Sequence, residues 1–426
     1  MNATKLINYI ASGELDSTLI SLYGEENLDS QKERYTKAIN EFIAIYGDID
    51  CNIFSVPGRS EISGNHTDHN HGEVLAGSIN LDIIAICAKT DDGVIKIQSE
   101  GFPQDVVDTA TYTEPCQDDY FKSSALIAGM AKAFTNAGYN IGGYVAYTTS
   151  NVFKGSGLSS SAAFEVMVGN ILNHLYNNGT VDNVEIAKMA QFSENEFFGK
   201  PCGLMDQMAC AVGGFVHIDF EDTKNPVIEK IDFDMSGAGY ALCIVNTGGN
   251  HADLNEDYAS VPAEMKAVAR FLGHEYLRQT CLADLMVNIG AIREELGDRA
   301  VLRAYHFFNE NERVKTQAEA LKNGDTDVFL AFVLKSGNSS YKYLQNVYTT
   351  KNVKEQGLSL ALAVTENLLC DTGSAYRVHG GGFAGTIQAF VPFQHVASYK
   401  EEIDSIFGAG ACHILRIRPQ GAIKVC

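Results

Sequence analysis

The stretch GSGLSSSAAFEVMVGNILNHLY (residues 155–176) passes from small polar residues into an apolar pattern with helical spacing. The apolar side chains that recur three or four residues apart are Phe164, Met167, Val168, Ile171 and Leu175. This spacing predicts a helix that begins within the serines. Backbone N–H groups and the helix dipole at such a start attract an anion such as phosphate. The stretch is neither a Walker A loop nor the dinucleotide GxGxxG, so a capped helix start without a ligand remains an alternative.

A second stretch, GRSEISGNHTDHNHG (residues 58–72), concentrates polar side chains between glycines, which favours a loop. His66, His69 and His71 could ligate zinc. Alternatively, Asn65, Asp68 and the histidines could supply the directional donors and acceptors that sugar hydroxyls require. A solvated loop without a ligand is the third interpretation.

A third segment, SENEFFGKPCGLMDQ (residues 193–207), contains Glu194 and Asp206 twelve residues apart. Phosphoryl transfer needs a divalent ion to neutralise phosphate charge and a group to receive the proton of the attacking hydroxyl. These two carboxylates could meet both needs if the turn at Gly199-Lys200-Pro201 brings them together. Two solvated acidic residues are the simpler alternative.

The order of helical and extended patterns predicts an α+β fold. Residues 2–47, 120–137, 183–198 and most of 256–345 have helical spacing, whereas 51–56, 81–89, 94–99 and 142–150 read as strands. We expect the strand 51–56 to end at Pro57-Gly58 and Asp91-Asp92-Gly93 to form a hairpin turn between 81–89 and 94–99. A boundary near residue 210 would divide the chain into two domains, 1–210 and 211–426.

The bulk composition narrows the classes of partner. A net charge of −21 in 426 residues is unlike a nucleic-acid-binding protein. The first residues are not typical of a signal peptide, and no apolar run reaches the length of a membrane span. Ten cysteines without a CxxC pair favour reduced thiols in the cytoplasm. We therefore expect a cytoplasmic protein that binds neither nucleic acid nor membrane; its oligomeric state is left open.

Three motifs together resemble those of the GHMP kinase superfamily, and within it the galactokinases. They are PGRSEISGNHTDHNHGEVL (57–75), GSGLSSSAAFEV (155–166) and HGGGFAGTIQAFV (379–391). CGLMDQ (202–207), the segment from Asn250-His251 to Tyr258 and the stretch from RAYHFFNENERV to LKNGDTDVF (303–329) also match, so that the resemblance covers nearly the whole chain. It implies a two-domain fold with the active site between the domains. The activity it implies is ATP- and Mg²⁺-dependent phosphorylation of galactose at its anomeric hydroxyl.

The resemblance also assigns roles to residues. Asp206 is expected to be the catalytic carboxylate, with Arg59 beside it to keep it ionised and to stabilise the transferring phosphoryl group. Ser160 and Glu194 are expected to hold Mg²⁺. The triphosphate is expected to lie against Gly155, Ser156, Gly157, Leu158, Ser159, Ser160 and Ser161. The expected sugar contacts are Asn65, His66, Asp68, Gly203 and Tyr258.

Several positions depart from the galactokinase pattern. Asn65 stands where the family has a glutamate that contacts the hydroxymethyl end of galactose, and Glu61 stands where it has an asparagine. His69 replaces a tyrosine, and His379 and Ala384 alter the last motif. Because Asn65 carries no charge, it would tolerate a carboxylate on the sugar, which makes galacturonate, or another sugar, an alternative substrate. A non-catalytic galactose sensor is a further alternative.

Overall fold

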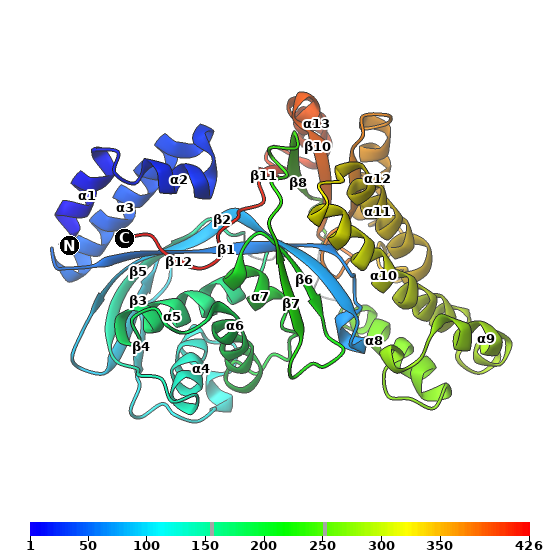
Figure 1. The fold of residues 1–426 in the computed structure, drawn as a ribbon, viewed down its shortest axis with the longest axis horizontal. Coiled ribbons are helices and arrows are strands. Elements are labelled where there is room, and N and C mark those ends of the chain that lie inside the picture. The colour runs from blue at the N-terminus through cyan, green and yellow to red at the C-terminus, as the bar shows by residue number, and fades with distance from the viewer. Residues whose placement is uncertain (154–156, 250–253) are drawn as a thin grey trace.

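The computed structural model describes residues 1–153, 157–249 and 254–426, which form two β-sheets flanked by helices. The larger sheet has the strand order β12-β1-β2-β5-β3-β4, with β6 and β7 added alongside β2. Its strands are β1 (Asn52–Ser63), β2 (Glu73–Lys89), β3 (Val94–Ser99), β4 (Asp105–Asp108), β5 (Tyr144–Ser150), β6 (Phe215–Asp219), β7 (Val227–Ile231) and β12 (Ile423–Lys424). The long strands β1 and β2 extend across the molecule toward the second sheet (Figure 1).

Helices cover both faces of the larger sheet. One face packs against α1 (Ala3–Ala11), α2 (Asp16–Tyr23) and α3 (Leu28–Tyr46), and the other against α4 (Ser123–Asn136), α5 (Ser160–Tyr176), α6 (Asn183–Phe192) and α7 (Met205–Val212). The continuous apolar run in β2 follows from this arrangement, because successive side chains point to opposite faces. Ile84 and Ile86 pack toward α1–α3, whereas Ala85 and Cys87 pack toward the other helices.

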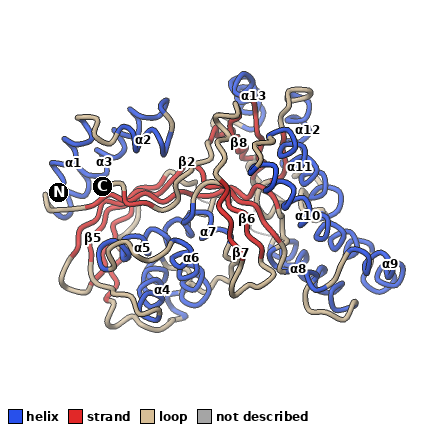
Figure 2. Tube along the Cα trace, viewed as in Figure 1, coloured by secondary structure: helices blue, strands red, loops and turns tan. Residues whose placement is uncertain are grey.

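The smaller sheet has the order β11-β8-β10-β9 and is also covered on both faces. Its strands are β8 (Tyr240–Asn246), β9 (Ala375–Val378), β10 (Thr386–Pro392) and β11 (Cys412–Leu415). The helices of this half are α8 (Asn255–Phe271), α9 (Leu282–Leu296), α10 (Asp298–Lys322), α11 (Thr326–Ser339), α12 (Gly357–Leu368) and α13 (Phe393–Phe407). Figure 2 shows that helices dominate this half, and that α9 lies at its outer end.

The predicted α+β class is confirmed, but two local predictions are wrong. β1 does not end at Pro57-Gly58: it continues to Ser63, because irregularities in its pairing with β2 between Pro57 and Arg59 and between Glu61 and Ser63 accommodate the proline and glycine. The predicted hairpin is absent, since β5 lies between β2 and β3 and pairs with both. The domain boundary near residue 210 remains a prediction; β6 and β7, which follow it, belong to the larger sheet.

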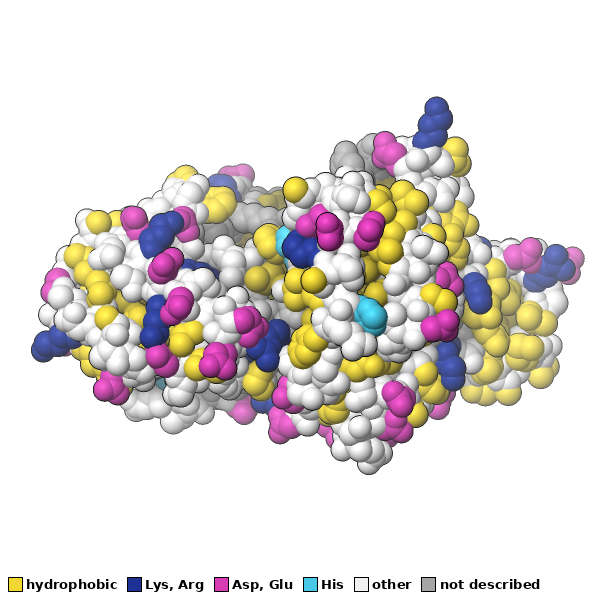
Figure 3. All heavy atoms as spheres, turned by 90° about the horizontal axis from the view of Figure 1, so that it is seen from above, with side chains coloured by type: hydrophobic (Ala, Val, Ile, Leu, Met, Phe, Trp, Pro, Cys, Tyr) yellow, Lys and Arg dark blue, Asp and Glu magenta, His cyan; other side chains and the backbone are white. Residues whose placement is uncertain are grey.

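The visible surface carries both signs of charge. On the face in Figure 3, Lys and Arg side chains lie among acidic ones and do not form a broad basic surface. Among the helices of the described residues, none combines the length and the apolar character that crossing a bilayer would require.

A buried carboxylate, Asp82, ties the larger sheet to the two ends of the chain. Arg34 of α3 donates to its Oδ1 at 2.7 Å, and Arg418 donates to its Oδ2 at 3.2 Å. Tyr23 and Ser55 also donate to Oδ2. Burial acts to raise the pKa of Asp82, but the two arginines and the hydroxyl donors outweigh it, and the net pKa is lowered. Asp82 therefore stays ionised in the folded protein.

We predict that Asp82→Asn lowers the free energy of unfolding by about 3 kcal/mol or more, because it leaves two arginines without their buried counter-charge. Urea unfolding followed by circular dichroism measures the change. The matched control is Glu114→Gln, which removes a carboxylate that is 76% exposed and pairs with Lys132; we expect a change within about 0.5 kcal/mol. Equal stability of the two variants would contradict the role assigned to Asp82.

Candidate active site

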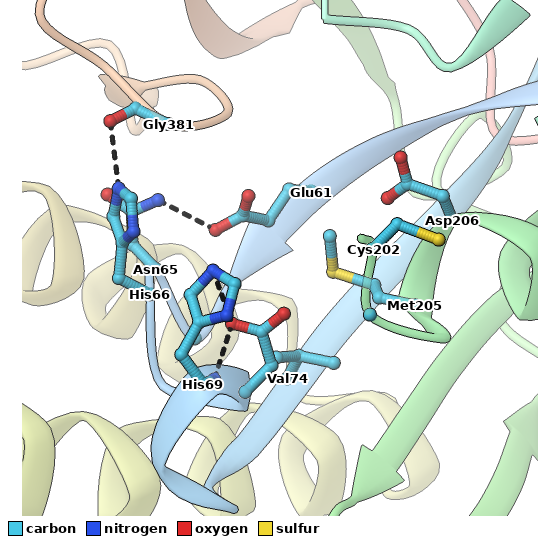
Figure 4. A pocket seen from close by; sticks show the side chains of 12 residues that line it. Glu61, Asn65, His66, His69, Val74, Cys202, Met205, Asp206 and Gly381 are labelled. Atoms are coloured by element: carbon cyan, nitrogen blue, oxygen red, sulfur yellow. Dashed lines mark hydrogen bonds and ion pairs between the residues drawn. The ribbon is translucent and has the colours of Figure 1, made fainter. Parts of the chain in front are cut away.

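A small polar cavity of about 190 Å³ lies where the end of β1, the start of α7 and the loop between β9 and β10 meet. Figure 4 shows Asn65 and His66 on one side of it and Cys202, Met205 and Asp206 on the other, with Glu61 between them. The complete lining is Glu61, Gly64, Asn65, His66, Asp68, His69, Val74, Cys202, Gly203, Met205, Asp206 and Gly381. Three of these residues are carboxylic acids, so the cavity favours a neutral ligand rich in hydroxyl groups over an anion.

Arg59 and Asp206 form a two-point ion pair at one end of this cavity. Arg59 Nε donates to Asp206 Oδ1 at 2.8 Å, and Nη2 donates to Oδ2 at 2.8 Å. The Arg59 side chain is 8% exposed, whereas that of Asp206 keeps 34% of its surface open. Withdrawal from water acts to raise the pKa of Asp206, but the charge of Arg59 and the hydrogen bonds from Ser159 and Arg59 lower it below its ordinary value. Asp206 is therefore a carboxylate at neutral pH.

The glycine-serine loop adjoins this pair. Helix α5 begins at Ser160, as the sequence predicts, and the preceding Ser159 has a left-handed backbone with φ 59°. Ser159 donates to Asp206, and Arg59 donates to the carbonyl of Gly157. Gly58 permits the close approach of β1, because a Cβ there would lie 2.7 Å from the carbonyl oxygen of Leu158. The predicted phosphate-binding residues Gly155 and Ser156 lie outside the described residues.

Glu194 lies near the start of α5 in a π-helical turn, Ser193–Phe197, that continues α6. Its carboxylate is buried and accepts hydrogen bonds from Ser161 at 3.3 Å, Lys200 at 2.9 Å and Gln207 at 2.7 Å. Carboxylate and hydroxyl oxygens are the donors that Mg²⁺ prefers, and Mg²⁺ in kinase sites takes only one or two of them from the protein. The Glu194 carboxylate and the serine hydroxyls at the start of α5 therefore suit Mg²⁺ as ligands. The hydroxyl that donates a hydrogen bond to Glu194 belongs to Ser161, the neighbour of the predicted ligand Ser160.

The loop after β1 presents His66 and Asp68 to the cavity. His66 Nε2 lies 2.9 Å from the carbonyl oxygen of Gly381, which can only accept, so Nε2 carries the proton and Nδ1 is left as an acceptor. Burial lowers the pKa of His66 to about 4 and outweighs the hydrogen bond to Gly381, which acts to raise it, so the ring stays neutral. Gly203 leaves room for Asp68, since a Cβ at 203 would lie 2.8 Å from Asp68 Oδ2.

The Asn65 side chain is held by hydrogen bonds to protein groups. It lines the cavity, but its amide already makes four hydrogen bonds. Nδ2 donates to Glu61 Oε1 at 2.8 Å and to the Gly380 carbonyl at 2.7 Å, while Oδ1 accepts from Asn346 at 2.6 Å and from Ser340 at 3.3 Å. Position 65 has lost an acidic side chain, but the carboxyl group of Glu61 lies beside it (Figure 4). Burial raises the pKa of Glu61, against the lowering effects of Arg377, the Asn65 hydrogen bond and Arg59.

Buried groups on α10 hold the loop in place. His306 Nε2 donates to the Asn65 carbonyl at 3.0 Å, and Glu310 accepts from the Gly64 N–H at 3.0 Å. Arg313 donates to Glu310 at 2.6 Å. These charges and polar groups are paired within the protein, which a buried network requires. The sequence did not single out His306 or Glu310, because the loop groups that they bind, at Asn65 and Gly64, are more than 200 residues away in the chain.

Two predicted features do not come together in the cavity. His71 stacks on Tyr276 with ring centroids 3.8 Å apart and is not part of the lining, and within the described part of the chain no three His, Cys, Asp or Glu residues form a metal-binding cluster. The zinc interpretation is therefore not supported. Tyr258 also lies outside the lining; its hydroxyl donates to the Gly382 carbonyl at 2.7 Å and so supports the glycine loop. Its contact with a sugar remains a prediction.

Comparison with protein-family models gives two matches. The GHMP kinases N terminal domain matches residues 123–214, and the galactokinase galactose-binding signature matches residues 40–89. The second match contains β1 and the loop that lines the cavity, and the first contains the glycine-serine loop, Glu194 and Asp206.

Individual proteins agree with these families. A galactokinase of Streptomyces coelicolor is 30% identical over 379 residues, which cover 88% of this chain and 94% of the relative. Among solved structures, Lactococcus lactis galactokinase complexed with galactose has a TM-score of 0.74 at 23% identity, covering 90% of this chain and 98% of that one. The Methanococcus jannaschii mevalonate kinase has a TM-score of 0.61 at 13% identity, covering 86% of this chain and 98% of that one. The chain belongs to the galactokinase family of the GHMP kinase superfamily.

Proposed function

We propose that the protein transfers the γ-phosphoryl group of ATP to the anomeric hydroxyl of galactose, giving galactose 1-phosphate and ADP. Membership of the galactokinase family and the match of residues 40–89 to its galactose-binding signature support this proposal. The single observation that carries it in the structure is the Arg59–Asp206 pair, which joins the polar cavity to the glycine-serine loop. That position puts one carboxylate within reach of both a sugar and a phosphate.

In this mechanism Asp206 orients the anomeric hydroxyl and receives its proton as the sugar oxygen bonds to phosphorus. Because its pKa is lowered, Asp206 is a weak base whose main contribution comes late, when phosphoryl transfer makes the sugar oxygen acidic. Arg59 keeps Asp206 ionised and places a positive charge next to the loop, where negative charge builds on the transferring group.

We propose that Mg²⁺ accompanies ATP and is held by Glu194 with a hydroxyl at the start of α5, that of Ser160 or Ser161. When bound, the ion would neutralise charge on the phosphate oxygens. Lys200 pairs with Glu194 at 2.9 Å and has a side chain that is 54% exposed. An exposed, flexible ammonium group can turn from the carboxylate to a phosphate oxygen when a cation takes its place.

The cavity favours galactose over galacturonate. Glu61, Asp68 and Asp206 all line it, so a sugar carboxylate would add a fourth acidic group to a space of about 190 Å³. An assay of ADP release with galactose and galacturonate at equal concentration tests this preference. Faster turnover of galacturonate would show that the protein phosphorylates an acidic sugar by the same chemistry. Sugar binding without ADP release would indicate a non-catalytic sensor.

We also propose that the cavity lies between two domains, 1–210 and 211–426.

We further propose that the protein works in the cytoplasm. All ten cysteines are unpaired, which agrees with a reducing compartment.

We predict that Asp206→Asn lowers kcat with galactose by about 10²- to 10⁴-fold and leaves KM within about threefold, because the amide cannot accept the proton. The coupled ADP-release assay measures both constants, and thermal melting checks the fold. Asp327→Asn, at an exposed position on α11, is the matched control and should turn over normally. Normal turnover by Asp206→Asn would remove Asp206 from the mechanism.

We predict that Glu194→Gln raises the Mg²⁺ concentration for half-maximal velocity about tenfold or more, since an amide is a much weaker ligand for a hard cation. A Mg²⁺ titration at saturating galactose measures it. Glu196→Gln is the control, because Glu196 is an exposed carboxylate in the same π-helical turn. If both variants keep the Mg²⁺ dependence of the parent protein, Glu194 is not a ligand.

A further inference from the structure

Glu61 is a buried carboxylic acid that lines the cavity and takes no part in the proposed phosphoryl transfer. It is 7% exposed and lies two residues after Arg59 on β1. Side chains two apart on a strand point to the same face. The pairing of Arg59, Ser60 and Glu61 with Ser78, Gly77 and Ala76 is regular, so the irregularities on either side do not interrupt this relation. The strand that brings Arg59 to the active site therefore also brings Glu61.

The Glu61 carboxylate is oriented by Asn65 and is open to the cavity. Asn65 Nδ2 donates to one oxygen, Oε1, at 2.8 Å. The described residues offer no hydrogen bond to the other oxygen, Oε2, and Glu61 lines the cavity. Asn65, by contrast, has used both donors and both acceptor positions of its amide on protein groups. Of these two side chains, Glu61, and not Asn65, has hydrogen-bonding capacity left for a ligand.

The position of Glu61 indicates which part of a sugar it would meet. Its carboxylate points toward Asn65 and away from Asp206 (Figure 4). If the anomeric hydroxyl lies against Asp206, Glu61 faces the far side of the ring, which carries the C4 hydroxyl and, on the neighbouring C5, the hydroxymethyl group. The galactokinase pattern has asparagine at position 61 and glutamate at position 65, so this chain contains the same two side-chain types in exchanged order.

We propose that Glu61 is a specificity-determining residue that accepts a hydrogen bond from the hydroxymethyl group of galactose, and that Asn65 is the positioning residue that orients it. The proposal rests on the proposed function and assigns to β1 a substrate contact in addition to Arg59. Glu61 accepts a hydrogen bond from the C6 hydroxyl of galactose and disfavours the C6 carboxylate of galacturonate at the same position. It therefore selects galactose against both 6-deoxygalactose and galacturonate.

The test compares kcat/KM for galactose, 6-deoxygalactose and galacturonate in the parent protein and in Glu61→Gln. We expect kcat/KM for galactose to fall about ten- to hundredfold, mainly through KM, because a charged acceptor becomes neutral. The value for 6-deoxygalactose should stay within about threefold, and the relative rate on galacturonate should rise. Glu114→Gln, which alters an exposed carboxylate that pairs with Lys132 of α4 and does not line the cavity, should change none of these ratios.

Because Glu61 is buried, an exchange variant accompanies the single change. Glu61→Asn combined with Asn65→Glu returns the carboxylate to position 65, and we expect it to recover the preference for galactose to within about threefold of the parent. Asn65→Glu alone should lose it, since two carboxylates then face each other. A uniform fall on all three sugars, or a lower melting temperature with unchanged ratios, would give Glu61 a structural role and overturn the proposal. Failure of the parent protein to phosphorylate galactose would instead overturn the proposed function.

Discussion

The ion pair between Arg59 and Asp206 is the constraint on which the active site depends. An arginine that is 8% exposed needs a counter-charge, and Asp206 provides it through two hydrogen bonds of 2.8 Å. The pair requires β1 from one part of the chain and α7 from another to meet, and Arg59 also binds the Gly157 carbonyl in the loop before α5. Three segments that are distant in sequence are thereby fixed around one carboxylate.

Much of this arrangement could be predicted from the sequence, for identifiable reasons. The helical spacing after the serines marked the start of α5, and the burial of β2 on both faces agrees with an apolar run too uniform for a solvated strand. The insertion of β5 between β2 and β3, in place of the predicted hairpin, could not be predicted, because turn residues indicate only that the chain changes direction. They carry no information about β5, which forms some fifty residues later and inserts between the two strands.

The error at Pro57 had the larger consequence for the site. Ending the strand there treated Glu61 as a loop residue, whose direction the sequence does not define. Once β1 is seen to run to Ser63, the two-residue spacing places Glu61 on the same face as Arg59.

The polar residues of α10 that hold the loop after β1 were missed for a different reason. His306 and Glu310 act through partners more than 200 residues away, and the helical pattern of their segment is the same whether such groups are buried or exposed.

The central claim is that a sugar lies in the cavity with its anomeric hydroxyl against Asp206. A crystal structure of the protein with galactose bound tests this most directly. We predict the anomeric oxygen within about 2.6–3.2 Å of the Asp206 carboxylate, with the hydroxymethyl group beside Glu61 at the other end of the cavity. A galactose whose hydroxymethyl group lies against Asp206, or one bound outside the cavity, would contradict the account.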